Sequence, residues 1–386
     1  MGRTIKIKGI SLFASVVYWA LTGCFAQTAK YTAFHPGEIW KDNNAVPINA
    51  HGGGILFHKG LYYWFGEHKI EGKAGNVAHV GVHSYSSKDL YNWKDEGIAL
   101  PVVSDTASDI QKGCILERPK VIYNARTKKF VMWFHIEQKG KGYGYARSGV
   151  AVASKPTGPY TFLYSLRSNS GVWPVNVLPV HKLPVSDSVM KTYFPGGGFP
   201  GHVDSLNILG KFFKEGQMAR DMTLFLDDDG KAYHIYASEY NATLHVAELN
   251  ESYTRHSGRY ARFFVGRFME APAICKYNGA YYLVMSGTTG WNPNPARGAV
   301  APSIWGPWKE TGNPCMNEDS ATTYHSQGTF ILPVAGKKNA FIFLADRWNA
   351  ENAIDGRYVW LPVKFDNGNL QLPFYKQWTL DVFDRK

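Results

Sequence analysis

The segment "GRFMEAPAICKYNGAYYLVMSG", residues 266–287, has the pattern of a buried β-hairpin that begins with an acidic residue. Two apolar runs, 271–276 and 280–286, flank Asn278-Gly279, and Asn-Gly between two such runs is one of the strongest short hairpin signals. Glu270 lies at the mouth of the first predicted strand, directly before Ala-Pro. Because carboxylates are seldom buried without a partner, this residue needs a structural or functional explanation.

The same plan occurs in other parts of the chain: a polar residue opens a strand, a turn with Gly or Asn follows, and an aromatic-rich strand comes next. Helical periodicity is almost absent, and repeats of about 40–60 residues with short strands are typical of propeller blades. The sequence therefore predicts an all-β fold, a five-bladed β-propeller over residues 31–386. Residues 163–217, rich in Pro, Gly and Ser, are predicted to be an inserted loop region. The five repeats begin near Ala50, Leu116, Ala219, Gly266 and Tyr324.

The first strand of each propeller blade lines the central channel, so the polar residues that open these strands are expected to converge. Glycoside hydrolysis needs an acid for the leaving oxygen and a base for water, and in inverting enzymes the pair stands about 6.5–9.5 Å apart. The acid needs a raised pKa. A second carboxylate nearby and apolar walls around the acid both raise its pKa. The converging residues are His51, Glu117, Asp221, Glu270 and Gln327.

Composition narrows the classes of partner. The net charge is +11, but Lys and Arg are scattered without a run of five, which argues against nucleic acid and for a basic enzyme or lectin tolerant of acidic polymers. Cys114, Cys275 and Cys315 form no zinc pattern, and we expect mostly buried free thiols, with a single disulfide bridge as the alternative. We expect no cofactor and no metal in the site.

The N-terminus is predicted to be a signal peptide over residues 1–26. Basic residues precede the apolar stretch Ile10–Leu21, which is too short for a comfortable transmembrane helix. "LTGC" resembles a bacterial lipobox ending at Cys24, and the alternative is cleavage before Gln27. We therefore expect an exported protein that is periplasmic, secreted or lipid-anchored at the cell envelope, with a lipid on Cys24 as the only route to a membrane.

Several motifs resemble glycoside hydrolase family 43, whose members are five-bladed, inverting, exo-acting enzymes. "MEAPAICKYNGAYYLVMSG" matches the fourth-blade motif that carries the general acid, and "RDMTLFLDDDG" matches the third-blade motif that tunes it. The segments "AHGGGILFHKGLYYWFGEHK", "ERPKVIYN", "VMWFH", "TTGWNPNP" and "ADRW" are similar to the exo-β-1,3-galactanases, subfamily 24. The similarity spans about residues 35–365. It implies that Glu270 is the general acid and Asp221 the modulator of its pKa.

The resemblance implies roles for further residues. Glu117 would lie in the galactose pocket, and Gln327 would occupy the site that this subfamily uses in place of a base. An amide is a very weak base, so Gln327 would orient the attacking water or relay its proton through an imidic tautomer. Both routes require Gln327 on the opposite side of the sugar from Glu270, and His51 and Glu117 are rival bases. The expected substrate-binding residues are Glu67, Tyr143, Asn241, Thr288, Trp291 and His51.

Each assignment has a structural alternative. Glu270 could cap a turn, Asp221 could pair with Arg220 on the surface, and Trp291 could be core packing. Some relatives hold a structural calcium ion in the central channel. A calcium site there is the alternative to the expectation that the site holds no metal. The first blade also departs from the broader family, because it reads "NAHGGG" where most members carry an aspartate base.

The predicted function is that of an exported, inverting exo-β-1,3-galactosidase. It would release galactose from the β-1,3-galactan backbone of arabinogalactan. One alternative is another family 43 activity, an α-L-arabinofuranosidase or a β-xylosidase, against which the absent first-blade aspartate argues. The other is a non-catalytic carbohydrate-binding propeller.

Overall fold

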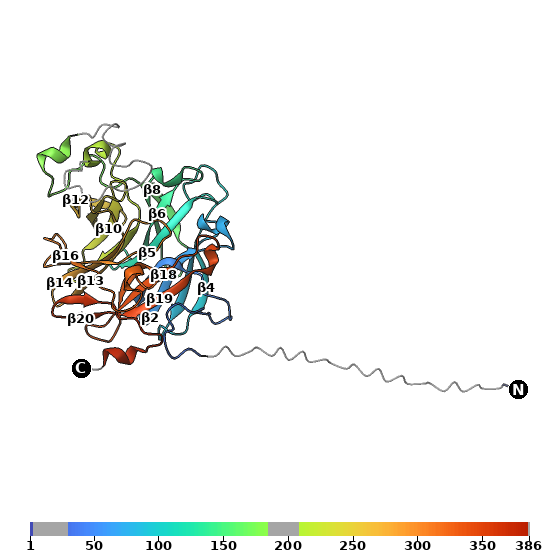
Figure 1. The fold of residues 1–386 in the computed structure, drawn as a ribbon. Coiled ribbons are helices and arrows are strands. Elements are labelled where there is room, and N and C mark those ends of the chain that lie inside the picture. The colour runs from blue at the N-terminus through green and yellow to red at the C-terminus, as the bar shows by residue number, and fades with distance from the viewer. Residues whose placement is uncertain (3–29, 184–207, 385–386) are drawn as a thin grey trace.

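The chain forms a ring of five antiparallel β-sheets, which confirms the predicted propeller (Figure 1). The computed structural model describes residues 1–2, 30–183 and 208–384. Within these ranges the first strands of the sheets, β1, β5, β9, β13 and β17, contact one another in a closed circle. Each sheet continues outward from its first strand in chain order. The residues that open the first strands are therefore brought to the centre of the ring.

Four blades have four strands, and the fifth has three and is followed by the short hairpin β20–β21. The strands are β1 (His51–His58), β2 (Leu61–His68), β3 (Gly81–Ser87), β4 (Lys94–Pro101), β5 (Ile115–Asn124), β6 (Lys129–Glu137), β7 (Arg147–Ala153), β8 (Thr161–Leu166), β9 (Met222–Leu226), β10 (Ala232–Ser238), β11 (Thr243–Leu249), β12 (His256–Phe263), β13 (Met269–Tyr277), β14 (Ala280–Gly287), β15 (Arg297–Ala301), β16 (Lys309–Gly312), β17 (Gln327–Pro333), β18 (Phe341–Arg347), β19 (Arg357–Pro362), β20 (Lys364–Asp366) and β21 (Asn369–Gln371).

The helices of the described part of the chain are short 3₁₀ turns, and none is long and apolar enough to cross a membrane. They are η1 (Lys73–Asn76), η2 (Gly142–Gly144), η3 (Pro179–Lys182), η5 (Ile208–Phe212), η6 (Ser320–Thr322), η7 (Ala353–Asp355) and η8 (Leu380–Phe383).

The hairpin at residues 266–287 forms as predicted, with β13 and β14 joined by Asn278 and Gly279. Both turn residues have positive φ, 48° and 81°, as the tight primed turns of hairpins require. Glu270 pairs with Ser286, and the strand register shifts between Glu270 and Ala273. The first strands of blades one, two and five have a register shift at the same end. Such bulges bend a strand and re-aim its side chains, here at the mouth of the channel.

Large aromatic side chains fill the junction between the first and last blades. Trp64 of β2 lies 4.8 Å, between ring centroids, from Trp360 of β19, and Phe34 stacks on Trp378. The backbone N–H of Phe34 also donates to the carbonyl of Trp378 (2.9 Å). Because aromatic side chains bury large apolar areas, this cluster holds the ring closed.

The region between blades two and three packs partly on its neighbours. Residues 163–166, expected to start the inserted loop, form the end of β8. Trp173 stacks on Phe213 (4.1 Å), and the N–H of Val175 donates to the carbonyl of Tyr260 in β12 (2.8 Å). The lipobox and all but the first two residues of the predicted signal peptide lie outside the described residues. Cys114, Cys275 and Cys315 are buried free thiols, as predicted.

Gly66 offers a test of how tightly the first blade is built. A Cβ at Gly66 would lie 2.0 Å from the carbonyl carbon of Ala50, a backbone atom that cannot move alone. We expect Gly66→Ala to lower the free energy of unfolding by about 3 kcal/mol, as overpacking of a rigid core does. Urea unfolding followed by tryptophan fluorescence measures this. Gly144→Ala is the matched control, because nothing lies within 4 Å of its Cβ position; equal stability of the two variants would contradict the close packing.

Candidate active site

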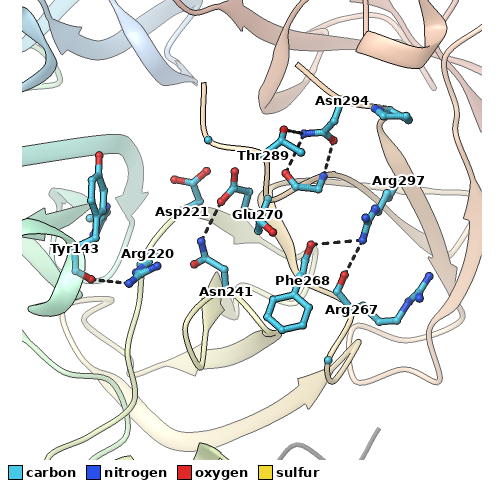
Figure 2. Close-up of a pocket in the computed structure, with 16 residues that line it drawn as sticks. Tyr143, Arg220, Asp221, Asn241, Arg267, Phe268, Glu270, Thr289, Asn294 and Arg297 are labelled. Carbon is cyan, nitrogen blue, oxygen red and sulfur yellow. Dashed lines mark hydrogen bonds between the residues drawn. The ribbon is translucent and has the colours of Figure 1, made fainter. Parts of the chain in front are cut away.

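Two adjoining cavities open at the centre of the ring, one of about 860 Å³ and one of about 210 Å³. Glu270, Asp221, Tyr143 and Gly290 line both. Figure 2 shows the larger cavity, with Glu270 and Asp221 side by side at its centre. The two carboxyl groups therefore stand where the cavities meet.

Most of the site residues predicted from the sequence are brought together here. Those that line the smaller cavity are Glu67, Glu117, Tyr143, Asp221, Glu270, Trp291 and Gln327. Asn241 and Thr288 line the larger cavity. Lys69, Arg118 and Trp348 also line the smaller cavity, and none of them was predicted from the sequence to be a site residue.

The carboxyl group of Glu270 is held by two amides. Asn241 Nδ2 donates to Oε2 (3.0 Å), and Gln327 Nε2 donates to Oε1 (3.1 Å). Burial and the negative charge of Asp221 raise the pKa of Glu270 to about 8, although Arg118 and the Gln327 hydrogen bond act in the opposite direction. Glu270 is therefore protonated at neutral pH and can donate a proton.

Asp221 pairs with a residue of another blade rather than with Arg220. Its Oδ2 accepts from the Arg118 guanidinium (2.8 Å). Arg220 donates instead to the backbone carbonyl of Tyr143 (2.7 Å), as Figure 2 shows. The surface ion pair considered from the sequence is therefore not formed.

Arg118 connects the walls of the smaller cavity. Besides Asp221, its guanidinium donates to the carbonyl of Gly328 (3.1 Å) and to Gln327 Oε1. Its backbone N–H donates to Glu67 Oε1 (3.0 Å). Arg118 has φ 57°, an uncommon value for a residue other than glycine, and it lies in the bulge of β5. The sequence signal was its position directly after Glu117 in "ERPKV".

Glu117 has the opposite electrostatic environment from Glu270. His135 Nδ1 contacts Oε2 (3.0 Å), and the Tyr143 hydroxyl donates to Oε1 (2.8 Å). Burial opposes ionisation, but the His135 hydrogen bond and charge outweigh it and lower the pKa of Glu117 to about 2. Burial likewise opposes the charge of His135, but Glu117 and Glu137 outweigh it and raise the pKa of His135 to about 9. The pair is a carboxylate and an imidazolium at neutral pH.

All the hydrogen-bonding positions of the Gln327 amide are occupied. Its Nε2 donates to Glu270 and to Ser286 Oγ (2.9 Å), and its Oε1 accepts from Arg118 and from Trp348 Nε1 (3.2 Å). A direct hydrogen bond therefore joins Gln327 to Glu270. That Gln327 stands opposite Glu270 across a bound sugar stays a prediction. Donors on the oxygen and acceptors for the nitrogen also favour the amide over the imidic tautomer.

His51 requires a correction. It opens β1 but is fully buried, lines neither cavity, and stacks on Tyr358 at 5.3 Å. Neither ring nitrogen has a hydrogen-bond partner in the described residues. Burial lowers the pKa of His51 to about 3, so the ring is neutral. A bulge in β1 after His51 places the ring behind the wall of the site.

The remaining wall of the smaller cavity is partly charged and partly aromatic. Glu67 forms an ion pair with Lys69 (2.7 Å), and burial raises the pKa of Glu67. Trp291 is 47% exposed and meets Trp348 edge to face at 6.2 Å. Flat rings at a polar opening suit the C–H faces of a sugar. Across residues 30–183 and 208–384, no group of three or more His, Cys, Asp or Glu is placed to hold a metal ion.

Comparisons with known proteins agree with this geometry. The model of glycosyl hydrolases family 43 matches residues 201–366. A family 43 β-1,3-galactosidase solved with galactodeoxynojirimycin is 48% identical, with a TM-score of 0.84, over 90% of this chain and 100% of that chain. An exo-β-1,3-galactanase from Phanerochaete chrysosporium with β-1,3-galactotriose is 30% identical, with a TM-score of 0.72, over 91% of this chain and 69% of that one.

An exo-β-1,3-galactanase from Clostridium thermocellum is 36% identical, with a TM-score of 0.71, over 89% of this chain and 66% of that chain. No curated protein matches. The identity extends over nearly all of the chain, and the fold and the paired carboxyl groups agree with it. The chain belongs to glycoside hydrolase family 43.

Proposed function

We propose that the protein is an exported exo-β-1,3-galactosidase that removes galactose, with inversion, from the non-reducing end of the β-1,3-galactan backbone of arabinogalactan. The position of Glu270 carries this proposal. Glu270 stands between a cavity of about 210 Å³ and one of about 860 Å³. The smaller cavity suits one terminal sugar and the larger one suits the rest of the chain, so the scissile bond would lie beside the acid.

Glu270 acts as the general acid in this proposal. Its raised pKa keeps a proton on the carboxyl group at neutral pH, and the proton passes to the glycosidic oxygen as the bond to the anomeric carbon breaks. Asp221 forms an ion pair with Arg118. Its charge supports the raised pKa of Glu270 and stabilises positive charge that develops on the sugar.

We propose that Glu117 is the base that activates the attacking water, on the side of the sugar where the water lies. It is an ionised carboxylate in the smaller cavity, and no hydrogen bond links it to Glu270 among the described residues. A carboxylate with a low pKa is a weak base, yet it accepts a proton far better than an amide does. Gln327 holds Glu270 in position through its amide N–H.

The substrate assignment draws on the relatives. The similar solved proteins are described as β-1,3-galactosidases or exo-β-1,3-galactanases. Export rests on the predicted signal peptide. The missing first-blade aspartate argues against an arabinofuranosidase or a xylosidase.

The first prediction for this function is that the purified protein releases galactose from β-1,3-galactan, initially as the α-anomer. Glu270→Gln should lower this activity by about 10²–10⁴-fold, because the poor leaving group needs the proton. An activated aryl β-galactoside should be affected less. Chromatography and NMR of fresh product measure both effects, and Glu251→Gln, a surface carboxylate paired with Arg126, is the control. Galacto-oligosaccharides as first products, or no galactose at all, would refute the proposal.

The pH dependence of the reaction gives a second prediction, in which two variants shift the alkaline limb of the pH–rate profile in opposite directions. The acid must be protonated, so kcat/KM should fall as pH rises through about 8, the pKa of Glu270. Asp221→Asn removes a charge that raises this pKa and should move the alkaline limb to lower pH. Gln327→Ala removes a hydrogen bond that lowers it and should move the limb to higher pH. Shifts in the same direction would disprove the assigned interactions.

Rescue by azide tests whether Glu117 is the group that activates the attacking water. Glu117→Ala should lose most activity, and added azide should restore part of it as the α-galactosyl azide, because azide attacks without a base. Gln327→Ala is the matched variant from the same cavity, and azide should not rescue it. Rescue of Gln327→Ala alone would place the water beside Gln327 and remove the role given to Glu117.

A further inference from the structure

The larger cavity contains three arginines, Arg220, Arg267 and Arg297. Its carboxyl groups are Asp221, which pairs with Arg118, and Glu270, which is protonated at neutral pH. The lining therefore has more positive than negative charge. Figure 2 shows Arg220 on the Tyr143 side of Glu270, and Arg297 on the side of Phe268 and Asn294.

The three arginines differ in how their charge is balanced. Arg267 forms a two-bond ion pair with Glu310 (2.8 and 2.9 Å). Arg220 and Arg297 have no carboxylate partner in the described part of the chain. Their positive charges are therefore not neutralised by the protein there.

Arg220 and Arg297 are held in place by backbone carbonyl groups. Arg220 donates to the carbonyl of Tyr143 (2.7 Å), and its Nε is buried without a hydrogen-bond partner. Arg297 donates to the carbonyls of Arg267 (2.6 Å) and Phe268 (3.4 Å). Carbonyl groups orient a guanidinium without cancelling its charge, and an unpaired buried donor is unfavourable. Both guanidinium groups would gain from an anionic ligand.

We propose that the larger cavity selects a leaving saccharide that carries a negative charge, above all the carboxylate of a uronic acid. This inference rests on the proposed function, because it assigns the larger cavity to the part of the substrate beyond the scissile bond. The anionic group lies within the chain that leaves and outside the smaller cavity, where Glu67 and Glu117 are already paired with the cations Lys69 and His135. The net charge of +11 also favours approach of an acidic polymer.

The test compares three β-1,3-galactotrioses that differ in one substituent on O6 of the second galactose. One carries glucuronic acid, one carries glucose, and one carries a sulfate ester. The glucose form matches the uronate in size without its charge. We expect kcat/KM to be on the order of tenfold higher for the uronate than for the glucose form, as one charge-assisted hydrogen bond provides. The sulfate form distinguishes a general preference for anions from recognition of a carboxylate.

Two arginine variants test whether Arg220 and Arg297 cause the preference for the uronate. Arg220→Gln and Arg297→Gln should each lower the ratio of uronate to glucose kcat/KM by at least about threefold. Arg126→Gln, a surface arginine paired with Glu251, should leave this ratio unchanged. Added salt should reduce the wild-type ratio, a measurement that requires no variant to fold.

The outcomes separate this inference from the proposed function. A wild-type ratio near one for both charged substrates, or a ratio that survives both arginine substitutions, overturns the inference while galactose release continues. A preference for the sulfate form alone retains the anionic cavity and refutes the uronate. If no galactose is released from any of the three substrates, the proposed function itself fails.

Discussion

A buried arginine, Arg118, links the blades at the centre of the ring. It extends from blade two to Asp221 before blade three and to Gln327 in blade five, and its backbone N–H binds Glu67 of blade one. Gln327 then bonds to Glu270 of blade four. Removing one partner of such a buried pair leaves an uncompensated charge and is costly. The position of Asp221 and, through Gln327, that of Glu270 therefore depend on this arginine.

Further buried charged groups lie next to this cluster. Beneath Arg118, Lys120 Nζ donates to the carbonyl of Gly52 (2.9 Å), and Asp346 accepts from the N–H of the same glycine (2.5 Å). Burial lowers the pKa of Lys120 to about 7 and raises that of Asp346 to about 7. These residues lie on strands of blades one, two and five.

The two central glutamates show how environment separates identical groups. Glu270 faces a like charge and accepts hydrogen bonds from two amides, whereas Glu117 is bonded to a charged imidazole and a phenol. Their pKa values are about 8 and about 2. Such a separation within one site is how a fold holds an acid and a carboxylate ready at the same pH. The family membership and the electrostatics thus lead independently to the same proposed acid.

The sequence by itself determined the repeat, the five blades and the hairpin at Asn278-Gly279, because turn chemistry and alternating apolar residues are local properties. It also identified Glu270, Asp221 and Glu117 as members of one site, since first strands must converge in a propeller. Only the tertiary structure decided that Arg118 joins them. Its partners are about 50 to more than 200 positions away in the sequence, and closure of the ring sets their distances. The bulges were also invisible in the sequence. One extra residue at a strand end turned His51 into the core, and contacts between blades bonded Gln327 to Glu270.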